Sequence, residues 1–218
     1  MVFDMDGVLA DSEPVYLAAA NAVLAAYGKS ITAEQHEAVM GHGVEDTWET
    51  LMAQLGLPGP MSRYISAYDG ELCRLLGRLS EPLPGVRPLV AELRRRGIPL
   101  AVASSSWPGW IDALLGGISL RGAFDALVSA KMVAHPKPAP DLYLLAARTL
   151  GCPPEVCIAV EDTPTGIAAA KAAGMLAVQV RASSTAFPPL PDADIVLDSL
   201  LDFDLSLLGS AAGGTGDA

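Results

Sequence analysis

The sequence predicts an α/β protein whose parallel sheet is interrupted, directly after its first strand, by a long helical segment. Beyond residue 82, short apolar runs of strand length alternate with helical patterns, and such alternation is typical of a parallel sheet covered by helices on both faces. Between residues 12 and 80, by contrast, only helical patterns occur. With 218 residues, of which 51% are hydrophobic, the chain can bury a sizeable core.

Five segments are predicted to form the strands of this sheet. Each is a short apolar run that ends in polar or turn-forming residues, as expected for strands buried on both faces. In chain order they are Val2–Phe3, Ile98–Ala103, Ala126–Val128, Val156–Val160 and Leu176–Val180. Helices are predicted between them, over residues 86–97, 108–115, 141–150 and 164–173.

The helical segment has clear local signals. Its first helix is predicted to begin at Asp11-Ser12-Glu13-Pro14, which combines a capping side chain, an acidic first turn and an early proline, and to end at Gly28. Farther along, apolar residues at helical spacing form an amphipathic face. These residues are Tyr68, Leu72, Leu75, Leu76 and Leu79.

These patterns predict a core made of residues 1–11 and 81–208, a helical cap of residues 12–80, and a disordered Gly/Ala/Ser-rich tail over residues 209–218. Ligands of open parallel sheets bind outside the carboxyl ends of the strands. A helical module inserted after the first strand is therefore expected to cover the binding site as a lid.

The composition excludes several classes of function. The net charge is −11, and the basic triplet Arg94-Arg95-Arg96 falls at the end of a predicted helix, where cations suit the helix dipole, so we expect no nucleic-acid partner. No apolar run approaches the roughly 18–20 residues of a membrane span, and no signal peptide is recognisable. Three cysteines without metal-ligand spacing are typical of free thiols in a reducing compartment, so we expect a cytoplasmic protein.

Polar side chains that suit phosphate chemistry follow several of the predicted strands. Asp4-x-Asp6-Gly7 follows the first strand, and Ser104 follows the second. Lys137 lies in the loop beyond the third strand, and Glu161-Asp162 follow the fourth. Each alone has a structural explanation, such as a turn or a helix cap. Together, and in this order, they predict one site at the carboxyl edge of the sheet.

With these motifs the sequence resembles the haloacid dehalogenase (HAD) superfamily, and within it the β-phosphoglucomutase-like and sugar-phosphatase branch with a helical cap. The residues that carry the resemblance are Phe3–Pro14, Ala101–Ser106, Lys137–Asp141 and Val160–Thr163. The resemblance implies a Rossmann-like parallel sheet of strand order 5-4-1-2-3, with the first strand at its centre. It also implies a phosphoric monoester hydrolase that works through an aspartyl-phosphate intermediate.

The physical chemistry of the motif residues agrees with the catalytic roles that the resemblance implies. Asp4 would attack phosphorus as the nucleophile, which splits hydrolysis into two easier steps. Asp6 would protonate the leaving oxygen and then take a proton from the attacking water. Ser104 would hydrogen-bond a phosphoryl oxygen, and Lys137 would neutralise both the nucleophile and the charge that develops on the phosphoryl group.

The resemblance also implies Mg²⁺ as the cofactor. An anion that attacks an anion needs its repulsion cancelled, and Mg²⁺ prefers hard oxygen ligands. The expected ligands are the carboxylates of Asp4 and Asp162 and the backbone carbonyl of Asp6, with Glu161 supporting the metal shell.

Substrate contacts are predicted at Ser105, beside Ser104, and at His42 and Gly43, in a segment where the family places its specificity loop. The two glycines that flank His42 suggest a mobile turn. The lid favours a small phosphorylated metabolite, such as a sugar or polyol phosphate, because it cannot close over a macromolecule. We expect a monomer or a weak homodimer.

Other reactions of the superfamily fit less well. The dehalogenases lack the acid at Asp6, and Lys29, the only lysine of the predicted cap, ends a helix and is a poor match for a Schiff-base lysine. The main alternative is a β-phosphoglucomutase-type phosphomutase. The mutases carry a histidine where this chain has Tyr16, and a cap lysine for which only arginines could substitute here, so hydrolysis is favoured. A non-catalytic phosphate-binding regulatory module is the second alternative.

Overall fold

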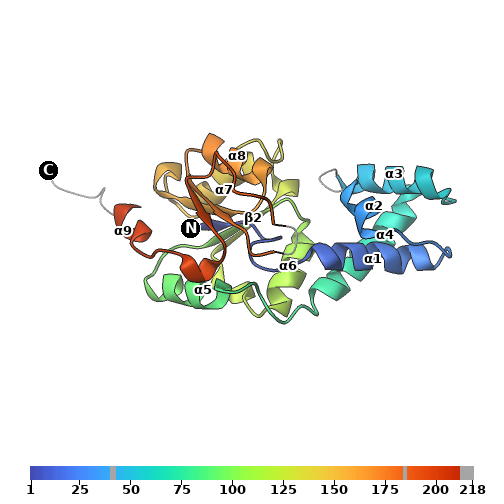
Figure 1. Cartoon of the computed structure of the whole chain (residues 1–218), viewed down its shortest axis with the longest axis horizontal. Helices are drawn as coiled ribbons and strands as arrows, with labels where there is room; N and C mark the ends of the chain where they lie inside the picture. Colours follow the sequence, from blue (N-terminus) through green and yellow to red (C-terminus); the bar gives the residue numbers. More distant parts are fainter. Residues whose placement is uncertain (40–42, 184–185, 212–218) are drawn as a thin grey trace.

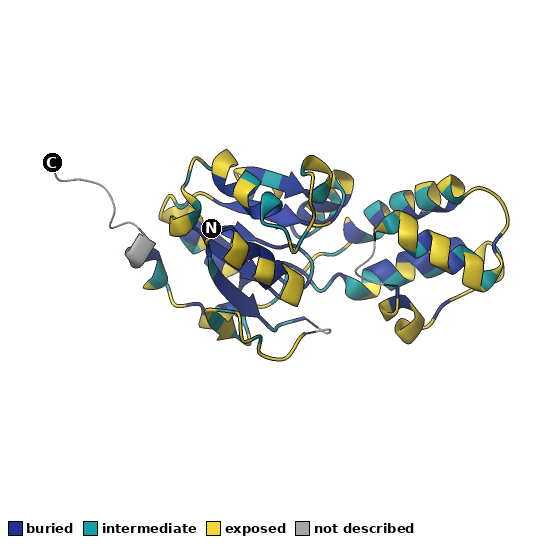
Figure 2. Cartoon of the chain, turned by 90° about the horizontal axis from the view of Figure 1, so that it is seen from above, coloured by how far each residue is buried: buried dark blue, intermediate teal, exposed yellow. Residues whose placement is uncertain are grey.

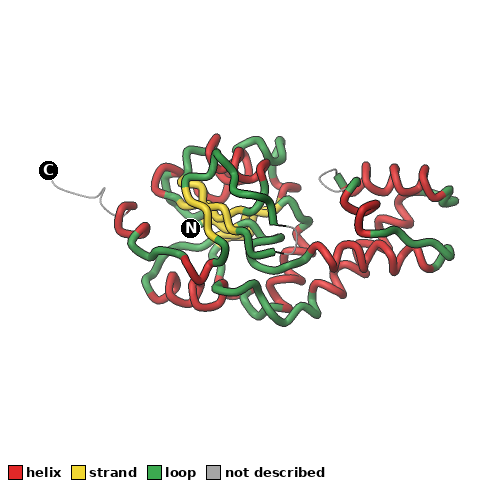
Figure 3. Tube along the Cα trace, viewed as in Figure 1, coloured by secondary structure: helices red, strands yellow, loops and turns green. Residues whose placement is uncertain are grey.

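The structure is a computed structural model, and it describes residues 1–39, 43–183 and 186–211 of the chain. Figure 1 shows two bodies side by side, and Figure 3 shows that the strands all lie in one of them. We call these the sheet body and, for helices α1 to α4, the helical body. The helices of the helical body are α1 (Glu13–Ala25), α2 (Ala33–Glu37), α3 (Val44–Leu55) and α4 (Met61–Leu76).

In the described part of the chain, six parallel strands form the sheet. They are β1 (Val2–Phe3), β2 (Ala101–Ser104), β3 (Ala126–Ser129), β4 (Ile158–Glu161), β5 (Leu176–Val180) and β6 (Ile195–Leu197). Their order is β3-β2-β1-β4-β5-β6, which confirms the predicted Rossmann-like order of the first five strands. The sequence prediction missed β6, a three-residue edge strand whose apolar run is too short to be distinctive.

Helices cover both faces of the sheet (Figure 1). They are α5 (Val86–Arg95), α6 (Pro108–Gly117), α7 (Asp141–Thr149) and α8 (Pro164–Ala172), joined by the short 3₁₀ helices η1 (Arg121–Ala123), η2 (Ala130–Met132), η3 (Pro154–Val156) and η4 (Leu200–Asp202). Successive side chains of a strand point to opposite faces. Val2 accordingly packs in the cluster with α7 and α8, and Phe3 in the cluster shared with α5 and α6. Figure 2 colours most strand residues as buried, whereas the edge strand β6 is partly exposed.

The central strand β1 is only two residues long, yet it fixes the register of its neighbours. Val2 lies opposite Ala101 on one side and Ala159 on the other. The amide N of Asp4 continues this ladder by donating to the carbonyl of Val160 (2.9 Å). The residues that follow β1, β2 and β4 are therefore held level with one another.

The basic triplet at the end of α5 pairs with neighbouring carboxylates. Arg95 and Arg96 both bond Glu92, and Arg94 bonds Asp125. This agrees with the structural interpretation of the triplet. Within the described residues, none of the helices combines the length and the apolar character that crossing a membrane requires.

An aromatic cluster forms the interior of the helical body. Trp48 of α3 is buried, stacks on Tyr64 of α4 (ring centroids 5.6 Å apart) and meets Tyr68 edge-on (5.5 Å). The predicted boundaries between core and cap remain a prediction. Helix α9 (Leu207–Ala211) extends into the segment predicted to be a disordered tail, and residues 212–218 lie outside the described residues.

We predict that Trp48→Ala lowers the free energy of unfolding by about 3–5 kcal/mol, because it leaves a large cavity among fixed aromatic rings. Urea unfolding followed by circular dichroism measures this change. Phe187→Ala is the matched control, since Phe187 is 41% exposed whereas Trp48 is 1% exposed, and it should stay within about 0.5 kcal/mol of the unmodified protein. Equal effects of the two substitutions would contradict the cluster's role.

Candidate active site

The residues predicted to carry the chemistry meet at the carboxyl edge of the sheet. Asp4 follows β1, Ser104 ends β2, and Glu161 ends β4 with Asp162 directly after it. The edge is also the point where the strand order reverses, because β2 and β4 lie on opposite sides of β1. Open α/β sheets bind their ligands at this point.

Lys137 connects three parts of this edge. Its Nζ donates to Asp4 Oδ1 (2.5 Å), to Glu161 Oε1 (2.5 Å) and to the backbone carbonyl of Ala103 (3.1 Å). Only 6% of the Lys137 side chain is exposed. Three acceptors therefore satisfy the three protons of a buried ammonium group. The contact with Asp4 matches the predicted neutralisation of the nucleophile, whereas the contact with Glu161 was not predicted.

Glu161 is completely buried and fully hydrogen-bonded. Besides Lys137, the hydroxyl of Tyr143 donates to its Oε1 (2.7 Å). Its Oε2 accepts from the amide of Asp162 (3.0 Å) and from both the amide (3.3 Å) and the hydroxyl (3.1 Å) of Thr163. This residue is thus a structural anchor for the loop after β4.

The ionisation of the cluster follows from burial and from the shortage of positive charge. Burial raises the pKa of Asp4 to about 8, although Lys137 opposes the shift. Burial, together with the charges of Asp4 and Glu161, raises the pKa of Asp162 to about 9. For Glu161, burial would raise the pKa, but Lys137 and the hydrogen-bond donors outweigh it and hold the pKa below its usual value. Three carboxyl groups share one ammonium group.

The acidic cluster has the chemistry of a site for a hard cation. Carboxylate oxygens of Asp4, Glu161 and Asp162 lie within 4.8 Å of one another. Asp162 Oδ1 is buried and has no hydrogen-bond partner. Gly7 makes room for the Asp162 carboxylate, because a Cβ at Gly7 would lie 2.0 Å from Asp162 Oδ2, and its φ of +73° is one that glycine tolerates best. An orphaned oxygen beside two further carboxylates fits a divalent metal.

Asp6 has a different environment, in which hydroxyl groups replace charges. Its Oδ1 accepts from Ser12 Oγ (2.5 Å) and from the hydroxyl of Tyr16 (3.0 Å), and its Oδ2 accepts from Ser106 Oγ (2.9 Å). Ser104 Oγ is 3.5 Å from Oδ2, a weak contact. Burial raises the pKa of Asp6 and these hydroxyl donors oppose the shift. A raised pKa is what a carboxyl group needs to act as a proton donor near neutral pH.

The comparison with protein families agrees with this geometry. The family model for haloacid dehalogenase-like hydrolases matches residues 1–174. The chain belongs to the haloacid dehalogenase-like hydrolases. This confirms the resemblance that the motifs predicted.

Relatives of this hydrolase extend the result to its reaction class. It is 38% identical over 187 residues to the fructose-1-phosphate phosphatase YqaB of Escherichia coli, covering 83% of this chain and 95% of that protein. It is 33% identical over 206 residues to hexitol phosphatase B of the same organism, covering 92% of each. The crystal structure of CbbY from Rhodobacter sphaeroides in complex with phosphate superposes with a TM-score of 0.84, at 30% identity over 95% of this chain and 97% of CbbY. The predicted class, a phosphoric monoester hydrolase, is confirmed.

The predicted substrate contacts of this HAD-like hydrolase remain predictions. Ser105 is exposed beside the buried Ser104. Gly43 is the exposed N-cap of α3. His42 lies outside the described residues. Ser104 itself accepts a hydrogen bond from the amide of Ser106 (3.0 Å), which fixes its hydroxyl at the sheet edge.

The sequence reasoning missed four residues of the site. Ser12, Tyr16 and Ser106 surround Asp6, and Tyr143 supports Glu161. Ser12 was interpreted as part of a helix cap, yet its side chain does not cap α1. Tyr16 was named only as the residue at the position of the mutase histidine. Serine clusters and tyrosines on helices are common in cores and turns, so no local pattern marked these four residues as partners of Asp6 or Glu161.

We predict that Gly166→Ala, in the first turn of α8, destabilises the protein by about 1–3 kcal/mol. A Cβ at Gly166 would lie 1.9 Å from the Glu161 carboxylate, which is held on every side. Gly70→Ala in α4 is the matched control, because a Cβ there meets nothing within 4 Å. It should stabilise the protein by about 0.5–1 kcal/mol. Thermal unfolding of both variants measures the difference, and shifts of the same sign would contradict the packing against Glu161.

Proposed function

We propose that this chain is a Mg²⁺-dependent phosphatase that hydrolyses a small phosphorylated metabolite, a sugar or polyol phosphate, through an aspartyl-phosphate at Asp4. The observation that carries the proposal is the contact of Lys137 with Asp4 beside two further buried carboxyl groups. Such a cluster costs several kcal/mol of desolvation for each ion, and a structural role alone does not need it.

Asp4 is the proposed nucleophile. Its Oδ1 is bound by Lys137, which leaves Oδ2 for attack on phosphorus. In this step the bond between phosphorus and the leaving oxygen breaks as the bond to Asp4 forms, and Lys137 stabilises the negative charge of the phosphoryl oxygens. Ser104, at the end of the neighbouring strand, is placed to hydrogen-bond one of these oxygens.

Asp6 is the proposed acid and base. It gives its proton to the leaving oxygen in the first half of the reaction. In the second half it takes a proton from the water that attacks the aspartyl-phosphate. The hydroxyls of Ser12, Tyr16 and Ser106 orient the Asp6 carboxyl group for both transfers.

The residues present fit the proposed Mg²⁺. Asp4 and Asp162 would bind it through carboxylate oxygens, with the backbone carbonyl of Asp6 as a further ligand, and the buried unpaired Oδ1 of Asp162 supports this assignment. The cation supplies positive charge that offsets the repulsion between Asp4 and the phosphate. Glu161 has a supporting role, because its oxygens are engaged by Lys137, Tyr143 and the loop after β4.

The substrate class is inferred from the relatives. YqaB is named a fructose-1-phosphate phosphatase, hexitol phosphatase B is named for sugar alcohols, and a CbbY variant has been crystallised with xylulose-(1,5)bisphosphate. A helical body next to the carboxyl edge of the sheet suits a substrate of this size. A cytoplasmic location and a monomer or weak homodimer remain part of the proposal.

Hydrolysis is favoured over phosphomutation by the residue in contact with Asp6. Tyr16 stands where the mutases carry a histidine, and burial beside Asp6 raises its pKa far above the ordinary value, so it stays protonated and hydrogen-bonds Asp6 (3.0 Å) and Ser106 (2.7 Å). A mutase must also grip a second phosphate through its cap and keep water away from the aspartyl-phosphate. The helical segment contains no lysine besides Lys29, so the cap lysine of the mutases has no counterpart there.

We predict that Asp4→Asn lowers phosphate release from sugar phosphates and from p-nitrophenyl phosphate by about 10³-fold or more, because the amide is a poor nucleophile. Chelation by EDTA should abolish the activity of the unmodified enzyme, and added Mg²⁺ should restore it. Conversion of β-glucose 1-phosphate to the 6-phosphate without net phosphate release would instead identify a mutase. An inactive wild-type protein that still binds phosphate would favour the regulatory module.

We predict that Tyr16→Phe lowers kcat by about tenfold or more and changes KM little, because it removes a donor from the acid–base carboxyl and not from the substrate. Initial rates of phosphate release, measured over a range of concentrations of one sugar phosphate, give both kcat and KM. Tyr27→Phe, just beyond the C-terminal end of α1, is the control and should leave both constants unchanged. A KM effect without a kcat effect would show that Tyr16 binds substrate directly.

A further inference from the structure

A lysine near the catalytic residues takes no part in the chemistry proposed above. Lys131 lies in η2, directly after β3, and its amide donates to Ser129 Oγ (3.3 Å). Ser129 is level with Ser104 in the sheet register, and its hydroxyl donates to the carbonyl of Ser106 (2.6 Å). The backbone of Lys131 is therefore held at the same edge of the sheet as the catalytic residues.

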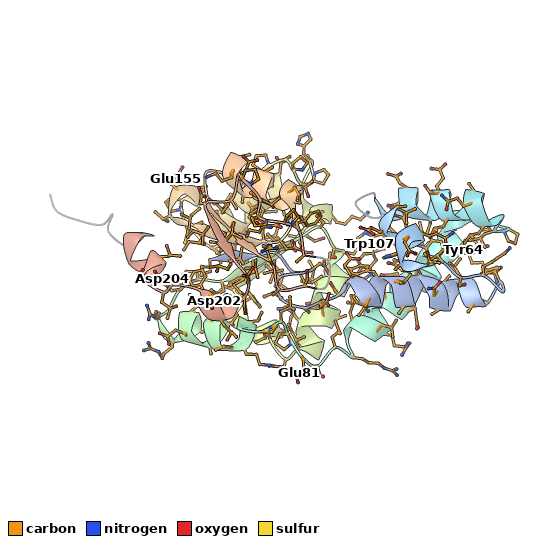
Figure 4. The ribbon with its side chains drawn as sticks, viewed as in Figure 1. Tyr64, Glu81, Trp107, Glu155, Asp202 and Asp204 are labelled. Atoms are coloured by element: carbon orange, nitrogen blue, oxygen red, sulfur yellow. The ribbon has the colours of Figure 1, made fainter. Side chains whose placement is uncertain are left out.

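The Lys131 side chain extends across Trp107 toward the helical body. Its Nζ lies 4.8 Å from the centroid of the Trp107 ring, within the range of a cation–π contact. Trp107 stacks on Trp110 (centroids 5.0 Å apart, 11° between the planes), so the ring that supports the ammonium is itself supported. Figure 4 shows Trp107 where the two bodies face each other. Trp107 directly follows Ser106, a partner of Asp6, so the ring that supports the ammonium is the next residue in the chain after the acid–base end of the site.

On the helical body, Lys131 has a loose partner. Its Nζ is 3.6 Å from Glu45 Oε1 in the first turn of α3, which is longer than a direct hydrogen bond. Both side chains are 52% exposed, and an ion pair of this kind contributes little free energy. Among the ion pairs between described residues, this is the one that joins the helical body to the sheet body. A substrate anion of better geometry can displace Glu45.

The two lysines near the site differ in how exposed they are and in whether their ammonium groups can still bind another anion. Lys137 is buried, and its three protons are donated to Asp4, Glu161 and a carbonyl, so apart from its charge beside the transferred phosphoryl group it has no free donor for a second anion. Lys131 is half exposed, lies on an aromatic ring and has only a distant carboxylate opposite it. In a chain of net charge −11, a cation presented in this way attracts an anion that the rest of the surface repels.

We propose that Lys131, supported by Trp107, binds a second anionic group of the substrate, a phosphate or a carboxylate remote from the transferred phosphoryl group, in exchange for Glu45. The enzyme thereby selects doubly anionic phosphomonoesters over those with a neutral remainder. This inference rests on the proposed phosphatase function and names the substrate class of the same site.

Steady-state kinetics on three kinds of substrate test the proposal: sugar monophosphates, sugar bisphosphates and phosphorylated sugar acids. Lys131→Gln should raise KM about threefold to tenfold for the two doubly anionic kinds and leave the monophosphates unchanged. Glu45→Gln should lower KM for the same two kinds, because the competing carboxylate is gone. The changes in KM caused by these two substitutions should both be smaller at high salt concentration. Lys171→Gln is the control and should change none of the constants. Lys171, on α8, is a partly exposed lysine that pairs with Asp194 (2.5 Å).

A selective loss on only one doubly anionic kind supports the proposal and identifies the bound group as phosphate or carboxylate. An equal loss on all three kinds would make the Lys131–Glu45 pair a structural tie and overturn the proposal, as would unchanged constants or failure of the wild type to turn over either doubly anionic kind. Hydrolysis of p-nitrophenyl phosphate, abolished by Asp4→Asn, separates the two levels of inference. If neither p-nitrophenyl phosphate nor any of the three kinds of substrate is hydrolysed, the phosphatase function itself is refuted. If hydrolysis occurs but the preference for doubly anionic substrates is missing, only the role of Lys131 is refuted.

Discussion

The ion pairs of Lys137 with Asp4 and Glu161 are the interaction on which the site depends. A buried ammonium group between two buried carboxylates tolerates no rearrangement, because any lost partner leaves an uncompensated charge in a medium of low dielectric constant. The pairs tie the loop beyond β3 to the ends of β1 and β4. Tyr143 and the close approach of Gly166 then fix Glu161 from its other sides. The electrostatic half of the site is thereby preorganised by the sheet body alone.

Asp6 is held by neutral hydrogen-bond donors, whereas Asp4 and Glu161 are held by a buried ammonium group. Its partners are neutral hydroxyls, and they come from both sides of the molecule: Ser12 and Tyr16 belong to the start of the helical segment, whereas Ser106 belongs to the loop after β2. Hydrogen bonds to neutral donors are weaker than ion pairs and exchange more easily. The position of the proposed acid and base therefore depends on how the helical body stands against the sheet, while the proposed nucleophile does not. Phosphoryl binding and proton transfer are thus supported by different parts of the chain.

The features that the sequence predicted correctly are those that depend on local periodicity or on where strands end. The stripe of α5, from Val86 to Leu93, is buried as its helical spacing indicates, and the five predicted apolar runs are strands in the predicted order. Where the sequence failed, the signal was short or ambiguous. Strand β6 has three residues, and Ser12 looked like a helix cap although its hydroxyl bonds Asp6. A serine hydroxyl can hydrogen-bond either the end of a helix or a distant carboxylate, and the local sequence does not indicate which of the two it bonds.

The sequence by itself determined the fold class, the order of the motif residues, and hence the meeting of Asp4, Ser104 and Glu161 at one edge, because parallel strands of a known order must end together. Only the tertiary structure decided which groups satisfy those residues. Tyr143 reaches Glu161, and Lys131 reaches both Trp107 and Glu45, through the packing of helices that are remote in the chain. The physical reason is that backbone pairing repeats a regular register that sequence patterns record. Side-chain partners across elements depend instead on rotamers and helix placement, which arise only when the whole core is packed.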